Sequence, residues 1–129
     1  MPVDLWSYRA SVVRIVDGDT VDVDVDLGFH VYVRVRLRLA WIDAAELRGP
    51  ERALGQLASG HLRELIEQFA VGRDEQNRPV IYVRTQKDRR GKYGRWLATL
   101  FGVNQHRDLI DLNLKMYADG YARLWEEGE

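Results

Sequence analysis

Five aspartates fall within the eleven residues of the segment VDGDTVDVDVD, at positions 16–26. Carboxylates gathered this closely either hold a cation or form the polar side of a strand, and their spacing separates the two cases. The last three alternate strictly with valines, which is the pattern of a strand with one wet face. Asp17 and Asp19 instead flank Gly18, in a turn before the alternation begins. Asp17 can shape that turn by hydrogen bonding to its own backbone, so Asp19 is the stronger candidate for chemistry.

Asp43 is the candidate partner of Asp19. It lies in the segment AWIDAAE, at the end of an apolar run, and shares odd-numbered positions with Leu39, Trp41 and Asp19. Two carboxylates that point inward at one end of a small barrel repel each other unless a cation lies between them. Carboxylates, a backbone carbonyl and water are the ligands that Ca²⁺ prefers. A calcium site and simple capping of the turn are both consistent with this spacing.

Glu46 lies three residues beyond Asp43, where the strand is expected to end. A carboxylate beside a bound cation can orient or deprotonate a water molecule. Glu46 can equally be a first-turn residue of the helix that Pro50 opens, and Glu51 is also placed for that role.

Three arginines alternate along the run that precedes Asp43. Arg34 and Arg36 are expected to pair with aspartates of the neighbouring strand. Arg38 lies nearest to Asp43, but strict alternation puts it on the opposite face from Asp43 and Asp19. A bulge or a strand end is therefore required to bring Arg38 and the two carboxylates together.

A basic loop, QKDRRGKYGR, occupies positions 86–95. Its cations are Lys87, Arg89, Arg90, Lys92 and Arg95. An exposed charged hairpin and a phosphate-binding loop are both consistent with this composition. In the second case Tyr93 can stack on a base, and Arg95, next to the start of a strand, is held firmly enough to bind a phosphodiester.

The elements that must position these side chains follow from hydrophobic periodicity. Strands are predicted at residues 11–16, 21–27, 31–39, 80–85 and 96–103, and helices at about 50–70 and 109–119. Three strands, a helix, two strands and a helix fit an α+β, mainly β fold. The order matches a five-stranded OB-fold barrel with two or three attached helices.

The second and third strands form a hairpin with two possible registers. One pairs Asp22 with Arg36 and Asp24 with Arg34, and a slip by two residues pairs Asp22 with Arg38 instead. Either register sets aspartates against arginines on the polar side and valines and leucines against the core. The helix at 50–70 presents a stripe of apolar residues, namely Leu54, Leu57, Leu62, Leu65 and Phe69. Of the tryptophans, Trp41 and Trp96 are expected in the core, with Trp6 and Trp125 closing the ends of the barrel.

The length and composition of the chain exclude several classes of protein. The chain of 129 residues is long enough for a single domain, spanning 1–129, and its 19 basic and 20 acidic residues nearly balance. It has no cysteine, which excludes thiolate chemistry and disulfides, and its three histidines show no zinc-site spacing, so they are expected to be structural. We see no signal peptide and no run long enough to cross a membrane, so the expected location is the cytoplasm.

Three motifs occur in order along the chain: VDGDTV, then RLAWIDAAE, then the KYGR of GKYGRWLA. Together they resemble the thermonuclease, or staphylococcal nuclease, family, and the resemblance covers approximately residues 12–120. The resemblance implies one staphylococcal-nuclease-like domain with the OB-type barrel that the strand pattern predicts independently.

The resemblance also implies roles for individual residues. Asp19 and Asp43 would bind Ca²⁺ together with the carbonyl of Ala44, and Glu46 would handle the attacking water. Arg38 and Arg95 would bind the scissile phosphate and offset the charge that builds up on it. Lys92 and Tyr93 would contact a terminal phosphate or the nucleotide.

The function implied is calcium-dependent hydrolysis of DNA and RNA phosphodiester bonds, with low sequence specificity and 3′-phosphate ends. Single-stranded or frayed nucleic acid is the expected partner, with no membrane involved, and the protein is expected to be a monomer. Two alternatives stay open. One is a non-catalytic OB-fold module that binds nucleic acid, and the other is an interaction domain whose Asp/Arg hairpin binds a protein.

Overall fold

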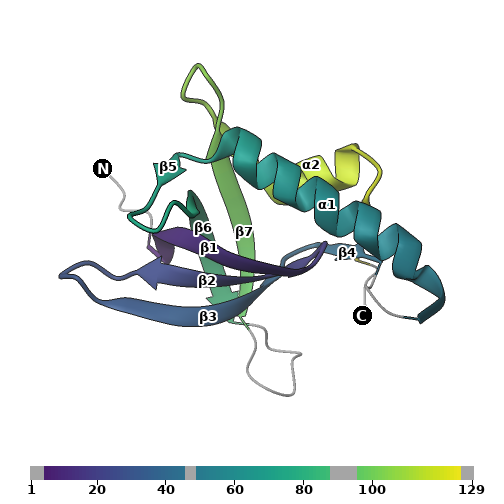
Figure 1. The fold of residues 1–129 in the computed structure, drawn as a ribbon, viewed down its shortest axis with the longest axis horizontal. Coiled ribbons are helices and arrows are strands. Elements are labelled where there is room, and N and C mark those ends of the chain that lie inside the picture. Colours follow the sequence, from purple (N-terminus) through teal and green to yellow (C-terminus); the bar gives the residue numbers. More distant parts are fainter. Residues whose placement is uncertain (1–4, 46–48, 88–95, 126–129) are drawn as a thin grey trace.

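The computed structural model describes residues 5–45, 49–87 and 96–125, and its centre is a closed five-stranded β-barrel (Figure 1). The barrel strands are β1 (Ser7–Asp17), β2 (Thr20–Asp26), β3 (Tyr32–Leu39), β6 (Pro79–Lys87) and β7 (Trp96–Val103). They pair in the order β6-β1-β2-β3-β7, and β6–β7 pairing closes the barrel. Only β3 and β7 run parallel. The predicted α+β, mainly β, OB-fold class is confirmed.

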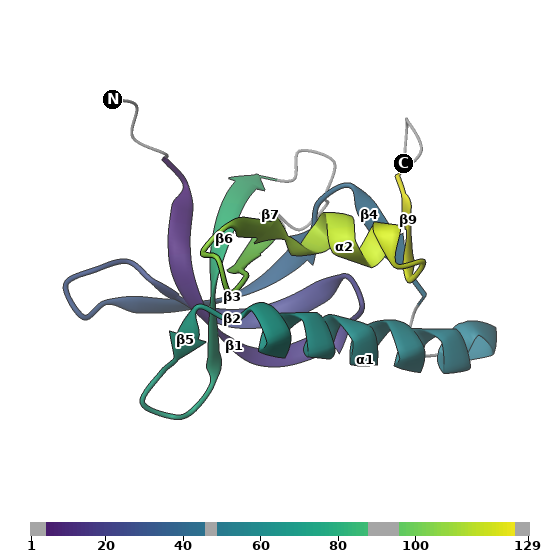
Figure 2. The same ribbon diagram turned by 90° about the horizontal axis from the view of Figure 1, so that it is seen from above.

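Two helices and four short strands complete the described fold. The 3₁₀ turn η1 (Gly49–Glu51) leads into α1 (Arg52–Phe69), and α2 (Leu112–Ala118) contacts α1 beside the barrel (Figure 2). The short strands are β4 (Ile42–Ala44), β5 (Gly72–Arg73), β8 (Leu109–Asp111) and β9 (Ala122–Leu124). The sequence did not predict them, because two or three residues carry no periodic signal, and the expected start of the last helix at 109 was wrong for the same reason. Within the described residues, no helix has the length and apolar composition needed to cross a membrane.

The core is built from the inward face of β2 and one face of α1. Val21 and Val23 of β2 and Leu62 of α1 are completely buried, and Ile66 of α1 is nearly so. Burying side chains of this size supplies the largest favourable contribution to folding. The apolar stripe predicted for α1 is interrupted at its start, since Leu54 and Leu57 are exposed.

The β2–β3 hairpin adopts the first of the two predicted registers. Asp22 lies opposite Arg36 and Asp24 opposite Arg34. Each arginine holds its aspartate with two hydrogen bonds, at 2.8 and 3.1 Å for Arg36 and at 2.7 and 3.0 Å for Arg34. The hydrogen bond from Arg36 lowers the pKa of Asp22 below its ordinary value, and Arg34 does the same for Asp24. The alternative register, with Arg38 opposite Asp22, is wrong.

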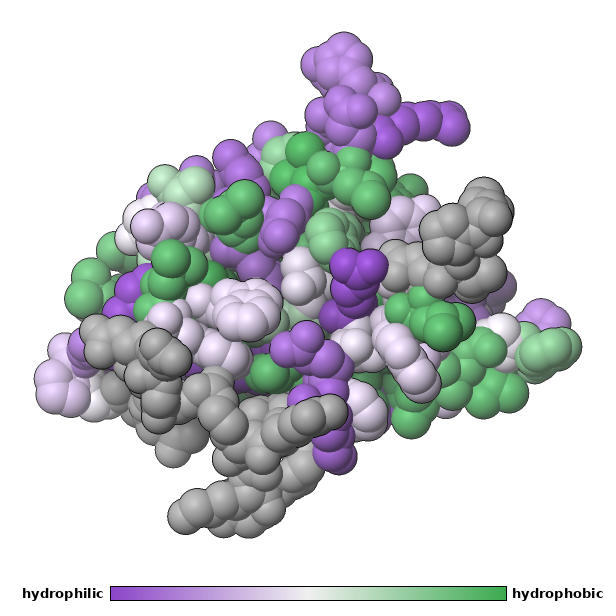
Figure 3. All heavy atoms as spheres, turned by 180° about the vertical axis from the view of Figure 1, so that it is seen from behind, coloured by the Kyte–Doolittle hydropathy of each residue, from purple (hydrophilic) through white to green (hydrophobic). Residues whose placement is uncertain are grey.

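The outer end of this hairpin does not face the core, contrary to expectation. Leu27, Val31 and Val33 are exposed, and Phe29 at the tip is almost wholly exposed. The hairpin extends beyond the rest of the barrel (Figure 1), so its last residues have nothing to pack against. Apolar side chains accordingly gather at the right-hand edge of the molecule seen from behind (Figure 3).

The expected core positions of Trp41 and Trp96 are also wrong. Trp41 is 62% exposed on the turn after β3, and Trp96, the first residue of β7, is partly exposed with the Lys87 ammonium 4.8 Å from its ring centroid. Trp6, which was expected to close one end of the barrel, is 63% exposed. All three residues lie where a strand begins or ends, and there the periodic pattern no longer says which face is buried.

One buried side chain, Asn113 of α2, connects three parts of the fold. Its Oδ1 accepts a hydrogen bond from the backbone N–H of Leu100 at 3.0 Å. Its Nδ2 donates to the carbonyls of Ala40 and Ala98, at 3.0 and 2.9 Å. Buried backbone groups need such partners, so Asn113 fixes α2 and the turn after β3 against β7.

We predict that Asn113→Ala lowers the free energy of unfolding by about 2–4 kcal/mol, because it leaves buried backbone groups without a partner. Urea denaturation followed by circular dichroism measures the change. Gln68→Ala, at an exposed position of α1, is the control and should change stability by no more than about 0.5 kcal/mol. Equal stability of the two variants would contradict the assigned role of Asn113.

Candidate functional site

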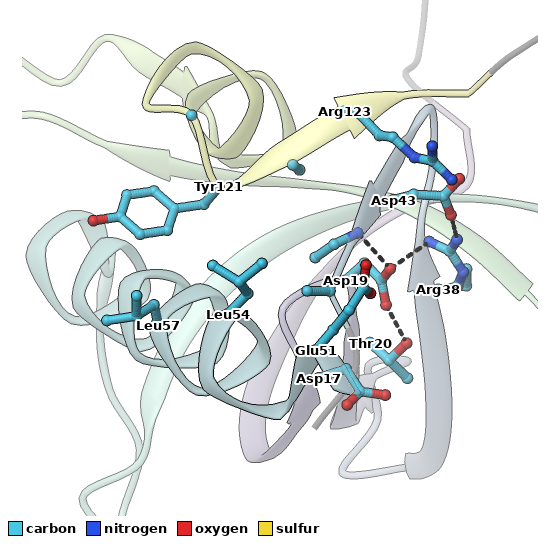
Figure 4. A pocket seen from close by; sticks show the side chains of 14 residues that line it. Asp17, Asp19, Thr20, Arg38, Asp43, Glu51, Leu54, Leu57, Tyr121 and Arg123 are labelled. Carbon is cyan, nitrogen blue, oxygen red and sulfur yellow. Dashed lines mark hydrogen bonds and ion pairs between the residues drawn. The ribbon is translucent and has the colours of Figure 1, made fainter. Parts of the chain in front are cut away.

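A cleft of about 990 Å³ opens at one end of the barrel (Figure 4). Its walls come from the turn between β1 and β2, the end of β3, β4, the start of α1, and the segment from Gly120 to Arg123. The charged side chains that line it are Asp17, Asp19, Asp43, Glu51, Arg38 and Arg123. Four carboxylates against two guanidiniums give these six groups a net charge of −2.

Asp19 is held by several neighbouring groups, and only 8% of the residue is exposed. Its Oδ1 accepts the Thr20 hydroxyl at 2.9 Å, and its Oδ2 accepts the Ala44 N–H at 2.9 Å. Arg38 Nη1 lies 3.3 Å from the same Oδ2. The carbonyl of Asp19 also accepts the N–H of Leu39 at 2.7 Å. Asp19 therefore ties the β1–β2 turn to β3 and β4.

Gly18 lets this turn approach helix α1. A Cβ at this position would lie 2.7 Å from the Cβ of Ala58 and 2.9 Å from the Cβ of Ala44. Both distances are far shorter than any ordinary carbon–carbon contact, and neither neighbour is a flexible side chain. A glycine is thus required here, because the turn and the helix leave no room for a side chain.

Arg38 lies between Asp19 and Asp43 (Figure 4). Its Nη2 donates to Asp43 Oδ1, and its Nη1 donates to the carbonyls of Leu39 and Ile42, at 3.2 and 2.8 Å. A guanidinium held by several acceptors at once has a fixed orientation. The structure thus brings together three of the residues singled out from the sequence.

The expected alternation of Asp43 with Leu39 and Trp41 was wrong, and the reason is a turn. Ala40 and Trp41 interrupt the strand, and Trp41 has a φ of 73°. After the turn Ile42 is buried, as Leu39 is before it, so even-numbered positions now face the core. Asp43 consequently lies on the side of Arg38. The sequence required a strand end or a bulge here but did not locate it.

The donor set fits a hard divalent cation in chemistry and charge. Asp19 and Asp43 offer oxygen ligands on two separate elements within reach of one guanidinium, and Ala44 lines the same cleft. Within the described residues, no three side chains of His, Cys, Asp or Glu come close enough to form a metal group by themselves. A cation here would need water and backbone oxygen as further ligands, and it would share both carboxylates with Arg38.

Four of the residues named from the sequence, Glu46, Lys92, Tyr93 and Arg95, lie outside the described residues. Their roles stay predictions.

Two side chains of the cleft were missed by the sequence. Arg123 on β9 lies directly opposite Asp43 in the β4–β9 pairing, and its guanidinium extends toward Asp43 (Figure 4). Tyr121 stacks on His61, with ring centroids 4.1 Å apart. The His61 Nε2 and Asp119 Oδ2 atoms are hydrogen bonded at 2.7 Å. A three-residue strand gives no periodicity, so no sequence signal pointed to Arg123.

The fold and the cleft together define a class: an OB-fold barrel with an arginine held between two carboxylates at one end. No family model matches the chain, and no curated protein matches it.

We predict that Gly18→Ala lowers the free energy of unfolding by about 1–3 kcal/mol, because the added methyl group overpacks the contact between the β1–β2 turn and α1. Thermal and urea unfolding measure the loss. Gly60→Ala is the control: Gly60 lies in α1, the helix that Gly18 approaches, and a Cβ there would meet nothing within 4 Å. This substitution should stabilise the protein by about 0.5–1 kcal/mol. A neutral Gly18→Ala would show that the turn does not need this close approach.

Proposed function

We propose that the protein is a calcium-dependent nuclease that hydrolyses phosphodiester bonds of DNA and RNA with low sequence specificity and leaves 3′-phosphate ends. The observation that carries the proposal is the placement of Arg38 between Asp19 and Asp43 in an open cleft of an OB-fold barrel. The three motifs of the sequence support the same activity.

Calcium would be held by Asp19, Asp43 and the carbonyl of Ala44, and when bound it would polarise a phosphoryl oxygen. Arg38 contributes a fixed cation to the same phosphate. Its Nη1 and one N–H of Nη2 are directed to protein acceptors, whereas no hydrogen bond within the described residues involves its Nε–H. That N–H and the second N–H of Nη2 can bind a phosphate oxygen, and they need no reorganisation to do so.

The charge of the cleft supports an activity that depends on a bound cation. A net charge of −2 on its lining residues opposes the approach of a polyanion, and one divalent cation would cancel it. Glu46 is proposed to orient or deprotonate the attacking water, Arg95 to bind the scissile phosphate, and Lys92 and Tyr93 to contact the nucleotide. These four roles rest on the resemblance of the motifs.

The alternative of a non-catalytic OB-fold module for nucleic acid shares the fold but needs no cation, whereas the cleft holds two carboxylates that could bind one. A protein-binding role of the Asp/Arg hairpin is less well supported. Arg34 and Arg36 each satisfy one aspartate with two hydrogen bonds, which leaves little of their charge for a partner. Single-stranded or frayed nucleic acid, a monomeric state and a cytoplasmic location remain parts of the proposal.

We predict that the protein releases acid-soluble nucleotide from denatured DNA with Ca²⁺ and not with EDTA. Arg38→Lys should lower kcat about 10²-fold, because an ammonium keeps the charge but loses the planar fork. Arg36→Lys is the matched control, since Arg36 lies on the same strand and pairs with Asp22 outside the cleft. Its activity should stay within about twofold of the unaltered protein.

The assay also separates the alternatives. Salt-sensitive binding of DNA without release of nucleotide under any divalent cation would favour the non-catalytic module. Full activity of Arg38→Lys, or equal losses in Arg38→Lys and Arg36→Lys, would contradict the role assigned to Arg38. Glu46→Gln and Arg95→Ala test the two catalytic positions outside the described residues, and each should lower kcat by at least about 10²-fold.

A further inference from the structure

Trp41 presents its indole ring to solvent next to the cleft. It lies on the turn that joins β3 to β4, and 62% of the residue is exposed. Its φ of 73° falls in the left-handed region, which a bulky side chain rarely adopts. Neither the exposure nor the conformation is explained by packing of the core.

The surrounding structure holds this backbone in place from three elements. The carbonyl of Trp41 accepts the N–H of Trp125 at 3.0 Å, and the N–H of Ala40 donates to the carbonyl of Ala98 at 2.9 Å. The carbonyl of Ala40 accepts Asn113 Nδ2 at 3.0 Å. A strained residue persists only where its neighbours determine its conformation in this way, and such residues cluster at functional sites.

Trp125 connects the exposed ring to the cleft. The ring centroids of Trp41 and Trp125 are 6.0 Å apart with their planes tilted by 46°, and the Trp125 indole donates to the carbonyl of Ile42 at 2.9 Å. Arg38 Cζ lies 5.6 Å from the centroid of the Trp125 ring. Trp125 therefore lies close to both Trp41 and Arg38, and we call these three side chains the Trp41–Trp125–Arg38 row.

We propose that Trp41, supported by Trp125, is a stacking platform for an unpaired base of single-stranded nucleic acid, with a neighbouring phosphate at Arg38. This inference rests on the proposed function and adds to it how the substrate is positioned. Every base has a π-face, so stacking on an indole holds a base without reading its identity. A base within a duplex has no free face, so the platform selects single-stranded or frayed substrate.

The guanidiniums beside the rings favour nucleic acid over other occupants of this surface, once a divalent cation offsets the carboxylates of the cleft. The row ends at Arg38, and Arg123 lines the same cleft two positions before Trp125. Aromatic rings next to a guanidinium suit a base and its neighbouring phosphate. A membrane surface or an apolar protein partner would call for a wider apolar patch than one pair of rings beside a charged cleft.

The test measures binding of two fluorescein-labelled octamers by anisotropy, in Ca²⁺ and in EDTA. One is oligothymidylate and the other is an abasic chain of the same length, both with phosphorothioate links so that hydrolysis does not compete. The variants are Trp41→Asn, whose side chain tolerates a positive φ, and Trp41→Phe, which keeps a ring. Trp6→Asn is the matched control, because Trp6 is also exposed, at 63%, and also has a positive φ, of 69°. Trp6 precedes β1, whereas the cleft residue Asp17 is the last residue of that strand.

We expect Trp41→Asn to weaken binding of oligothymidylate by about 5- to 150-fold and to leave binding of the abasic octamer unchanged. Trp41→Phe should restore most of the affinity, and Trp6→Asn should bind both octamers as the unaltered protein does. Far-UV circular dichroism of each variant checks that the fold is kept.

Other outcomes overturn the proposal in distinguishable ways. If Trp41→Asn binds oligothymidylate normally while the unaltered protein releases nucleotide with Ca²⁺, the platform is wrong and the nuclease proposal stands. If Trp41→Asn weakens the binding of both octamers equally, Trp41 acts only through Arg38 and is not a stacking platform. If the unaltered protein binds neither octamer, the platform is wrong whatever the release assay shows. A dimer in sedimentation velocity that Trp41→Asn dissociates would make a second copy of the chain the occupant.

Discussion

The turn at Ala40 and Trp41 is the constraint on which the candidate site depends, because it changes which face of the chain is buried. Before the turn Leu39 faces the core, and after it Ile42 does. Without this change, Arg38 and Asp43 would lie on opposite sides of one strand. The turn is held by Asn113 from α2 and by the backbone of Trp125. The site is therefore built by contacts between distant segments, and its geometry follows from how the barrel end is closed.

Arg38 has a structural role beside its proposed catalytic one, because its positive charge compensates two nearby carboxylates. Its side chain and that of Asp19 are mostly buried, and Asp43 is partly so. Two carboxylates this close are unfavourable unless a cation compensates them, and removing one partner from a buried ion pair typically destabilises by about 3–5 kcal/mol. Loss of the whole Arg38 side chain would therefore mix a folding defect with a catalytic one. A bound divalent cation would also compensate the two carboxylates. The affinity of the site for that cation therefore depends on how easily the ion pairs of Arg38 with Asp19 and Asp43 are weakened.

Much of the fold could be predicted from the sequence, since the β2–β3 ladder, α1 and the barrel class all follow from long periodic runs. The prediction failed where periodicity ends. Trp41 was assigned to the core because alternation was extended through a turn that only tertiary hydrogen bonds hold. Leu54 and Leu57 were assigned to the buried face of α1, yet they line the cleft. Arg123 carried no signal at all, because its strand has three residues and exists only by pairing with β4.

The two walls of the cleft differ in a way that bears on its chemistry. Arg38, Asp43 and Arg123 lie on the side formed by β3, β4 and β9, while Leu54 and Leu57 face them from α1 (Figure 4). The first turns of α1 have no barrel strand to cover, which leaves these leucines as an apolar wall. A charged group bound between the walls would lose water on the apolar side, and its attraction to the guanidiniums would strengthen accordingly. Gly18 lets the β1–β2 turn, which carries Asp19, pack directly against Ala58 of α1, so the position of Asp19 in the cleft depends on this close approach.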